Sequence, residues 1–210
     1  MLDAERRAVC AHLSDLAALT PGTSGNLSVR RGDRFAVTPT GVPYDDIEAA
    51  DVPVLTLDGE QVAGDADPSS ETAMHRGIYR ERDAGAVAHT HSPWATTLAV
   101  LGEPVPPVHY ALAHAGGRVP VADYATYGTA DLAANVVATL TEADVSACLV
   151  ANHGVVATGE DAAAAVETAR AVETTARLYC QAATIGDPRE LPESELAAVA
   201  AKFDAYGQDE

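Results

Sequence analysis

The chain has 210 residues, of which 47% are hydrophobic and 21% charged, and this is the size and composition of one ordinary globular domain. A formal net charge of −18, from 13 Lys and Arg against 31 Asp and Glu, would repel a phosphate backbone and disfavours a nucleic-acid partner. Residues 1–20 lack the apolar core of a signal peptide, and no run of about 18 apolar residues occurs, so we expect a cytoplasmic protein without a membrane partner.

Hydrophobic periodicity and turn residues predict an alternation of helices and short strands. In chain order we expect a helix over residues 2–19, strands over 26–30, 35–38 and 52–57, a helix over 72–82 and a strand over 86–91, then helices over 92–101 and 131–140, strands over 147–151 and 155–157, and helices over 161–183 and 193–203. A serine cap is expected where Ser69 and Ser70 precede the helix whose first turn carries Glu71. No βαβ period or internal repeat is present, which predicts an α/β fold with a mainly antiparallel sheet.

Three histidines are candidate metal ligands. His89 and His91 lie two residues apart on an extended segment, so both imidazoles should point to the same side. His153 lies between two β-prone runs and precedes Gly154, which permits a tight turn. Three histidines with one open position are typical of a catalytic zinc site, although packed or surface histidines remain the alternative. The three cysteines are far apart and form no Cys-x-x-Cys pair, so a thiolate site is not indicated.

Glu71 is the candidate acid-base group. A carboxylate at the start of a helix can occupy the fourth metal position and also abstract a carbon-bound proton. The alternative is a capping residue that interacts with the helix dipole. The spacing of Glu71 and His75 also suits a metal pair on a helix, but His89 and His91 form the better pair, so His75 is interpreted as structural.

Three small polar stretches are candidates for binding a phosphate group. They contain Thr23 and Asn26, Thr40 and Gly41, and Ser69 and Ser70. Glycine allows backbone N–H groups to approach an anion, hydroxyl and amide groups donate hydrogen bonds, and a helix N-terminus favours negative charge. None of the three matches a Walker or Rossmann motif, and each taken alone is also a plausible turn or cap.

Lysine is almost absent, and this separates two ways of acting on a carbonyl compound. An enzyme that forms a Schiff base needs a lysine, and the chain has only Lys202, which is remote in sequence from the candidate residues. If the substrate is a carbonyl compound, a metal ion that polarises the carbonyl group is the mechanism left.

Several motifs in one order resemble the class II aldolase and adducin family, which is typified by L-fuculose-phosphate aldolase. These motifs are GTSGNLS at 22–28, VTPTGVPY at 37–44, PSSE at 68–71, HTH at 89–91, HYAL at 109–112, YATYGT at 124–129, NHG at 152–154 and KFDAYG at 202–207. The resemblance covers nearly the whole chain and implies a single domain over residues 1–210. It implies a three-layer α/β fold around a mainly antiparallel sheet, and a homotetramer with active sites between subunits.

The resemblance also assigns roles to individual residues. It implies one Zn²⁺ ion per subunit, bound by His89, His91, His153 and Glu71, with Glu71 as the catalytic base. It places the phosphate of dihydroxyacetone phosphate against Thr23, Asn26, Thr40, Gly41, Ser69 and Ser70.

Three tyrosines complete the implied site. Tyr110, from a neighbouring subunit, would protonate or stabilise the aldehyde oxygen. Tyr206, on a mobile C-terminal tail from about residue 204, would close over the aldehyde. Tyr127 stands where the family has a phenylalanine in the aldehyde pocket, and its hydroxyl group leaves the identity of the aldehyde open.

The leading hypothesis is therefore a zinc-dependent aldolase that cleaves L-fuculose 1-phosphate, or a related 1-phosphoketose, to dihydroxyacetone phosphate and L-lactaldehyde or a similar aldehyde. One alternative is a pentulose-phosphate 4-epimerase or another sugar-phosphate lyase or decarboxylase of the same family. Another is an adducin-like interaction domain, but members of that kind lack the three histidines that this chain keeps.

Overall fold

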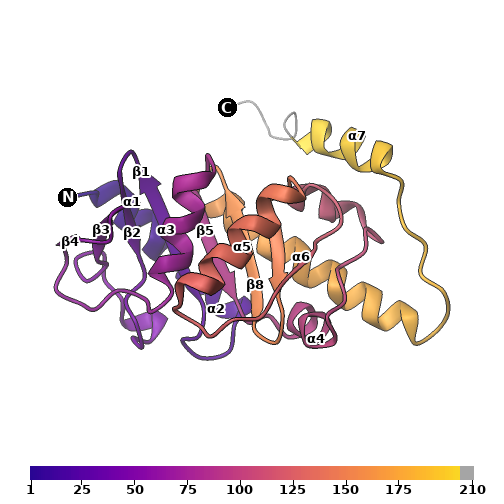
Figure 1. Ribbon diagram of the computed structural model, residues 1–210, viewed down its shortest axis with the longest axis horizontal. Coiled ribbons are helices and arrows are strands. Elements are labelled where there is room, and N and C mark those ends of the chain that lie inside the picture. Colours follow the sequence, from indigo (N-terminus) through magenta and orange to yellow (C-terminus); the bar gives the residue numbers. More distant parts are fainter. Residues whose placement is uncertain (204–210) are drawn as a thin grey trace.

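The computed structural model describes residues 1–203, and it contains one eight-stranded sheet with helices on both faces (Figure 1). The strands are β1 (Asn26–Arg31), β2 (Arg34–Val37), β3 (Val54–Thr56), β4 (Gln61–Ala63), β5 (Ala86–Thr90), β6 (Val121–Ala122), β7 (Ala147–Val150) and β8 (Gly154–Gly159). Their order across the sheet is β4-β3-β2-β1-β5-β8-β7-β6. Every pair is antiparallel except β6 and β7, so the predicted three-layer α/β fold with a mainly antiparallel sheet is confirmed.

Helices cover the two faces of the sheet and enclose two hydrophobic cores. The α-helices are α1 (Asp3–Ala11), α2 (Leu13–Leu19), α3 (Thr72–Glu81), α4 (Pro93–Leu101), α5 (Ala130–Glu142), α6 (Ala162–Ala183) and α7 (Glu193–Phe203), and two short 3₁₀ helices are η1 (Tyr44–Asp46) and η2 (Tyr110–Ala115). One core joins the sheet to α1, α2, α4 and α6, and the other joins it to α3 and α5. Figure 1 shows α3 and α5 side by side over their face. None of the helices within residues 1–203 is long and apolar enough to span a membrane.

Alternation along the strands decides which side chains face α3. In β1, Leu27 and Val29 belong to the core under α1 and α6. Asn26 and Ser28 therefore face the opposite side, because neighbouring side chains of a strand alternate between faces. Asn26 pairs in register with His89 of β5. The α3 side of the sheet thus carries a row of buried polar residues at the end of β1 and β5.

The predicted helix over residues 2–19 is wrong in one respect, because the segment forms two helices. His12 lies between α1 and α2 with φ −112° and ψ 9°. Its ring Nδ1 donates to the carbonyl oxygen of Ala8 at 2.9 Å, while its backbone N–H bonds to Val9. The side chain takes the carbonyl group that a continuing α-helix would need, and the helix breaks there.

The expected serine cap of α3 is also wrong. Glu71 occupies the N-cap position of α3, and no side chain makes a capping hydrogen bond there. The Ser69 hydroxyl instead accepts from the Glu71 backbone N–H at 3.2 Å, so it closes the turn before the helix. The Glu71 carboxylate points away from the helix end, toward the histidines.

Candidate active site

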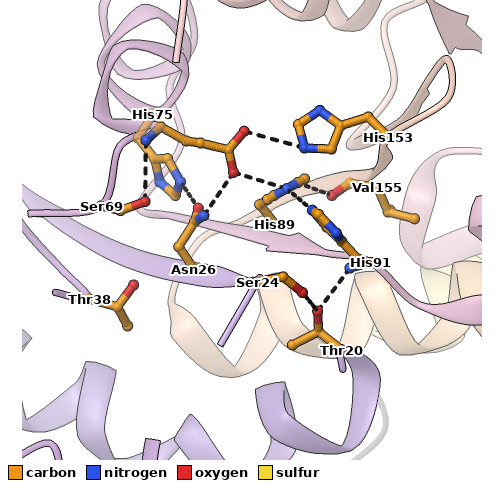
Figure 2. Close-up of polar contacts among 12 residues, drawn as sticks. Thr20, Ser24, Asn26, Thr38, Ser69, His75, His89, His91, His153 and Val155 are labelled. Atoms are coloured by element: carbon orange, nitrogen blue, oxygen red, sulfur yellow. Dashed lines mark hydrogen bonds and ion pairs between the residues drawn. The ribbon is translucent and has the colours of Figure 1, made fainter. Parts of the chain in front are cut away.

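Four predicted metal ligands meet at one end of the sheet. Ligand atoms of Glu71, His89, His91 and His153 all lie within 4.8 Å of one another. Glu71 comes from the start of α3, His89 from β5, His91 from the residues just after β5, and His153 from the turn between β7 and β8. Figure 2 shows the three imidazole rings turned toward one another.

Strand geometry explains how His89 and His91 come together. Ala86 and Ala88 belong to the core under α6, whereas Val87 belongs to the core under α3. The same alternation turns His89 and His91 toward α3. Their Nε2 atoms are 2.9 Å apart, and the backbone N–H of His91 donates to the buried Thr20 hydroxyl at 3.1 Å.

His153 is placed by a tight turn that packs against β5. Asn152 adopts φ 55°, a left-handed conformation that asparagine tolerates better than most residues. A Cβ atom at Gly154 would lie 2.4 Å from the carbonyl oxygen of Thr90 and 3.1 Å from the His91 ring. Glycine is therefore required at 154 for the turn to approach the end of β5 closely enough to bring His153 to the other ligands.

The proton on the His89 ring is located by a backbone acceptor. His89 Nδ1 lies 2.8 Å from the carbonyl oxygen of Val155, which can only accept, so Nδ1 carries the hydrogen. In the neutral ring the lone pair then lies on Nε2, which faces Glu71 and His91. A ring oriented by a carbonyl group in this way is the usual arrangement of a metal-binding histidine.

The two carboxylate oxygens of Glu71 have different surroundings. Oε2 accepts from Asn26 Nδ2 at 3.0 Å and lies 3.0 Å from His89 Nε2. Oε1 lies 3.5 Å from His153 Nε2 and is buried without a hydrogen-bond partner among the described residues. A buried carboxylate oxygen without a donor is costly unless a cation binds it. Three imidazole nitrogens and this carboxylate therefore fit a divalent metal ion.

The ionisation of these groups suits metal binding. Burial lowers the pKa of His91 to about 4 and also lowers the pKa of His153, so both rings are neutral near pH 7. Burial opposes ionisation of Glu71, but the attraction of the His89 ring in its protonated form and the hydrogen bond from the Asn26 amide outweigh it and hold the pKa of the carboxyl group below its usual range. Neutral imidazoles and a carboxylate are the forms that coordinate a metal ion.

A cavity of about 350 Å³ opens beside the four ligands. Besides Glu71, His91 and His153, it is lined by Ser24, Ser70, Tyr124, Ala125, Tyr127 and Asn152. Its volume lies in the range of small-molecule sites. The predicted aldehyde-pocket residue Tyr127 lines this cavity and is 65% exposed.

The three predicted phosphate-binding stretches run next to one another. Thr38 hydrogen-bonds through its backbone to Leu27 and to Ser69, and this links all three stretches. Ser70 lines the cavity, Ser69 and Asn26 are buried, and Thr23, Thr40 and Gly41 are exposed outside the cavity wall. Ser24 lines the cavity although the sequence analysis singled out its neighbour Thr23.

The remaining predicted residues lie away from the cavity or outside the described range. Tyr110 begins η2, is 52% exposed and does not line the cavity. Tyr206 lies outside the described residues. Lys202 is exposed on α7 and also does not line the cavity.

Five residues of the site were not predicted from the sequence. Thr20 contacts the His91 backbone, and Ser24, Tyr124, Ala125 and Asn152 line the cavity. Tyr124 and Asn152 fall inside motifs that were quoted, YATYGT and NHG, so their positions carried a usable signal. Thr20 ends a helix without any motif, and its contact across 71 residues of chain had no signal.

Fold and site together are those of an enzyme with a candidate metal site and a small-molecule cavity at the end of a mainly antiparallel sheet. The profile of the Class II Aldolase and Adducin N-terminal domain matches residues 5–180, and the chain belongs to this family. The chain is a lyase of the class II aldolase type; aldolases of this family use a divalent metal ion and act on phosphorylated sugars, and the group of Glu71 and three histidines could bind such an ion.

Individual relatives cover nearly the whole chain. The 5-methylthioribulose-1-phosphate/5-deoxyribulose-1-phosphate aldolase of Rhodospirillum rubrum is 42% identical over 91% of this chain and 86% of its own length. The 5-deoxy-D-ribulose 1-phosphate aldolase of Bacillus thuringiensis serovar kurstaki is 40% identical over 99% of both chains. A solved L-fuculose 1-phosphate aldolase superposes with a TM-score of 0.90, at 38% identity over 96% of both chains.

Proposed function

We propose that this chain is a zinc-dependent aldolase that cleaves a 1-phosphoketose with a short, deoxygenated end. L-Fuculose 1-phosphate would give dihydroxyacetone phosphate and L-lactaldehyde, and 5-deoxyribulose 1-phosphate would give dihydroxyacetone phosphate and acetaldehyde. The observation that carries the proposal is the convergence of three imidazoles on Glu71, whose Oε1 is buried beside the cavity without a donor among the described residues. The names of the relatives support both substrates.

The metal ion would be held by His89, His91, His153 and Glu71. When bound, it supplies a Lewis acid that polarises the ketone and stabilises negative charge. The soft-to-borderline imidazole set with one carboxylate favours Zn²⁺ over Mg²⁺ or Ca²⁺, which prefer oxygen ligands. The phosphate group would lie toward Ser70 and the adjoining stretches that contain Thr23, Asn26, Thr40, Gly41 and Ser69.

Proton transfer is assigned to Glu71 and Tyr110. In the condensation direction, Glu71 removes a proton from C3 of dihydroxyacetone phosphate, C3 attacks the aldehyde carbon, and the Tyr110 hydroxyl gives its proton to the aldehyde oxygen. Cleavage is the reverse: the proton of the C4 hydroxyl returns to Tyr110, the C3–C4 bond breaks, and Glu71 returns its proton to C3. Tyr110 would reach the cavity of a neighbouring subunit, because in its own subunit it does not line it.

A coupled assay for dihydroxyacetone phosphate tests the proposal directly. Purified protein is offered L-fuculose 1-phosphate, 5-deoxyribulose 1-phosphate and 5-methylthioribulose 1-phosphate before and after chelation and after Zn²⁺ is restored. We expect cleavage of at least one ketose, loss of activity on chelation and recovery with Zn²⁺. Activity that survives complete metal removal would overturn the mechanism. NMR analysis of the products that shows an epimer without triose phosphate would replace the aldolase with a 4-epimerase.

A further inference from the structure

His75 is a chemically active side chain that the proposed mechanism does not use. It lies on α3, one turn after Glu71, and is fully buried. Both of its ring nitrogens are engaged: Nδ1 lies 2.6 Å from the Ser28 hydroxyl, and Nε2 lies 2.5 Å from Asn26 Oδ1. Figure 2 shows His75 and Asn26 in contact on the side of the site away from His91.

The direction of each hydrogen bond in this group can be worked out from the Glu71 end. Asn26 Nδ2 donates to Glu71 Oε2 at 3.0 Å, so the amide oxygen faces His75. An amide oxygen only accepts, and His75 Nε2 must therefore carry a hydrogen. The orientation of the Asn26 amide and the tautomer of His75 are thus fixed together.

The opposite side of the ring continues the same chain. A fully buried imidazole that is not hydrogen-bonded to a carboxylate stays neutral, and because Nε2 carries the hydrogen, His75 Nδ1 is an acceptor. The Ser28 hydroxyl then donates to Nδ1, and its oxygen accepts from the Tyr79 hydroxyl at 2.7 Å. The result is one directed series of four hydrogen bonds that runs from Tyr79 through Ser28, His75 and Asn26 to Glu71.

This series matters because an asparagine amide can be placed in either of two orientations. The reversed orientation would turn Asn26 Oδ1 toward the Glu71 carboxylate and Asn26 Nδ2 toward the N–H of His75. Both contacts would then be repulsive. The hydrogen on His75 Nε2 thus selects the orientation that gives Glu71 Oε2 a donor, while Oε1 keeps none among the described residues.

We propose that His75 is a positioning residue for Glu71, which acts through Asn26 to hold Oε2 and leave Oε1 available for the metal ion and for proton transfer. The role in proton transfer rests on the proposed function. The role in presenting the carboxylate to a metal ion does not depend on which substrate the enzyme cleaves. A purely structural His75 would stabilise the fold without affecting either property.

Three variants separate these possibilities. His75→Leu removes the donor at similar volume. His75→Gln keeps an N–H that can reach Asn26 Oδ1. Ile78→Ala is the matched control, because Ile78 is equally buried on α3 but lies in the apolar core. For each protein, kcat and KM are measured at saturating Zn²⁺, Zn²⁺ affinity by competition with a chromophoric chelator, and stability by denaturant unfolding.

For His75→Leu we expect kcat and Zn²⁺ affinity each to fall by about 10- to 100-fold, with KM changed much less, as for other groups that orient metal ligands. His75→Gln should recover most of both losses, and Ile78→Ala should lose stability but keep kcat and Zn²⁺ affinity. If His75→Leu does not fold, His75→Met, with a flexible apolar side chain, takes its place.

The proposal is overturned if the apolar variant behaves like Ile78→Ala, or if His75→Gln folds but performs no better than the apolar variant. If the wild-type protein cleaves none of the ketoses, the proposed function fails, and the Zn²⁺ affinities alone decide the role of His75.

Discussion

Tyr127 brings a phenol group to the wall of the cavity that is lined by three of the four proposed metal ligands, Glu71, His91 and His153. Its side chain is 65% exposed in the subunit, so the hydroxyl group is free to meet a substrate. The proposed substrates differ at this end: the aldehyde portion of L-fuculose 1-phosphate carries a hydroxyl group that 5-deoxyribulose 1-phosphate lacks. A hydroxyl in the pocket can favour the hydroxylated aldehyde by donating or accepting a hydrogen bond.

We therefore predict that Tyr127→Phe shifts the preference toward the less polar substrate. The ratio of kcat/KM for L-fuculose 1-phosphate to that for 5-deoxyribulose 1-phosphate should fall roughly 2- to 10-fold, the value of one neutral hydrogen bond. Tyr179→Phe, which removes a hydroxyl outside the cavity, should leave the ratio unchanged. An unchanged ratio in Tyr127→Phe would show that the Tyr127 hydroxyl group does not contact the aldehyde portion of the substrate.

At the level of single residues, the sequence predicted those side chains whose position follows from local geometry. His89 and His91 fall on one face because strands alternate, and His153 needed only a turn. The contact of Asn26 with Glu71 was not predictable, since it joins residues 45 positions apart and depends on the packing of α3 over β1. His75 was interpreted as structural from the sequence. Its partners Ser28 and Asn26 could not be identified, because they too are distant from it along the chain.

Among the elements, the turn between β7 and β8 depends most on a single residue. Gly154→Ala would put a Cβ atom 2.4 Å from the Thr90 carbonyl oxygen, which belongs to rigid strand backbone. We predict a loss of stability of about 1–3 kcal/mol, typical of overpacking, and weaker Zn²⁺ binding because His153 moves. Gly186→Ala is the control, since nothing lies within 4 Å of its added Cβ atom. Equal unfolding midpoints for the two variants would contradict this role of Gly154.

The packing of α3 on the sheet predicts a dependence of stability on pH. Burial lowers the pKa of His75 to about 3 in the folded protein, whereas an unfolded chain has a value of about 6.5. Between these pH values the unfolded state binds more protons than the folded state. The contribution of His75 to the free energy of unfolding is therefore fully present above pH 6.5 and is lost as the pH falls toward 3. One such group contributes a slope of at most about 1.4 kcal/mol per pH unit.

Denaturant unfolding of the metal-free protein at pH 7, 6 and 5 measures this slope. The wild-type protein should lose stability at each step, with His91 and His153 acting in the same direction because burial lowers their pKa values too. His75→Leu should show a shallower slope, by up to one proton, and Ile78→Ala should keep the wild-type slope. Parallel curves for His75→Leu and wild type would show that His75 does not titrate in this way.

Helices with a long apolar repeat were predicted correctly. Elements whose position depends on a side-chain hydrogen bond or on pairing with a distant strand were not. Helices α6 and α7 were predicted to within one residue, since their boundaries follow Asp161 and proline-rich sequence. The strands β4 and β6 were missed because they have only three and two residues and form by pairing with β3 and β7. The break at His12 was missed because it depends on a side-chain bond to Ala8.

For the whole molecule, we expect a homotetramer whose active sites combine residues of two subunits. Glu71→Gln should lower activity by about 10²- to 10⁴-fold, as expected for loss of an acid-base group, and Tyr110→Phe should also impair turnover. Differently tagged Glu71→Gln and Tyr110→Phe subunits are co-expressed and co-purified. About a quarter of the sites in mixed oligomers should combine an intact Glu71 with an intact Tyr110, if subunits assemble randomly in a ring.

The mixed oligomers should therefore be far more active than either parent. Light scattering coupled to size exclusion gives their subunit number. No recovery of activity in a verified mixed oligomer would show that Tyr110 acts within its own subunit, or not at all.

The position of β5 within the sheet has a consequence for how the metal ion is acquired. β5 is hydrogen-bonded on both sides, to β1 and to β8, and its end presents His89. The conformational entropy of His89 is therefore lost when the chain folds, before any metal ion binds. Metal uptake should then be a simple binding step: amide hydrogens of β5 should remain slow to exchange after chelation, and restored Zn²⁺ should find its ligands already preorganised.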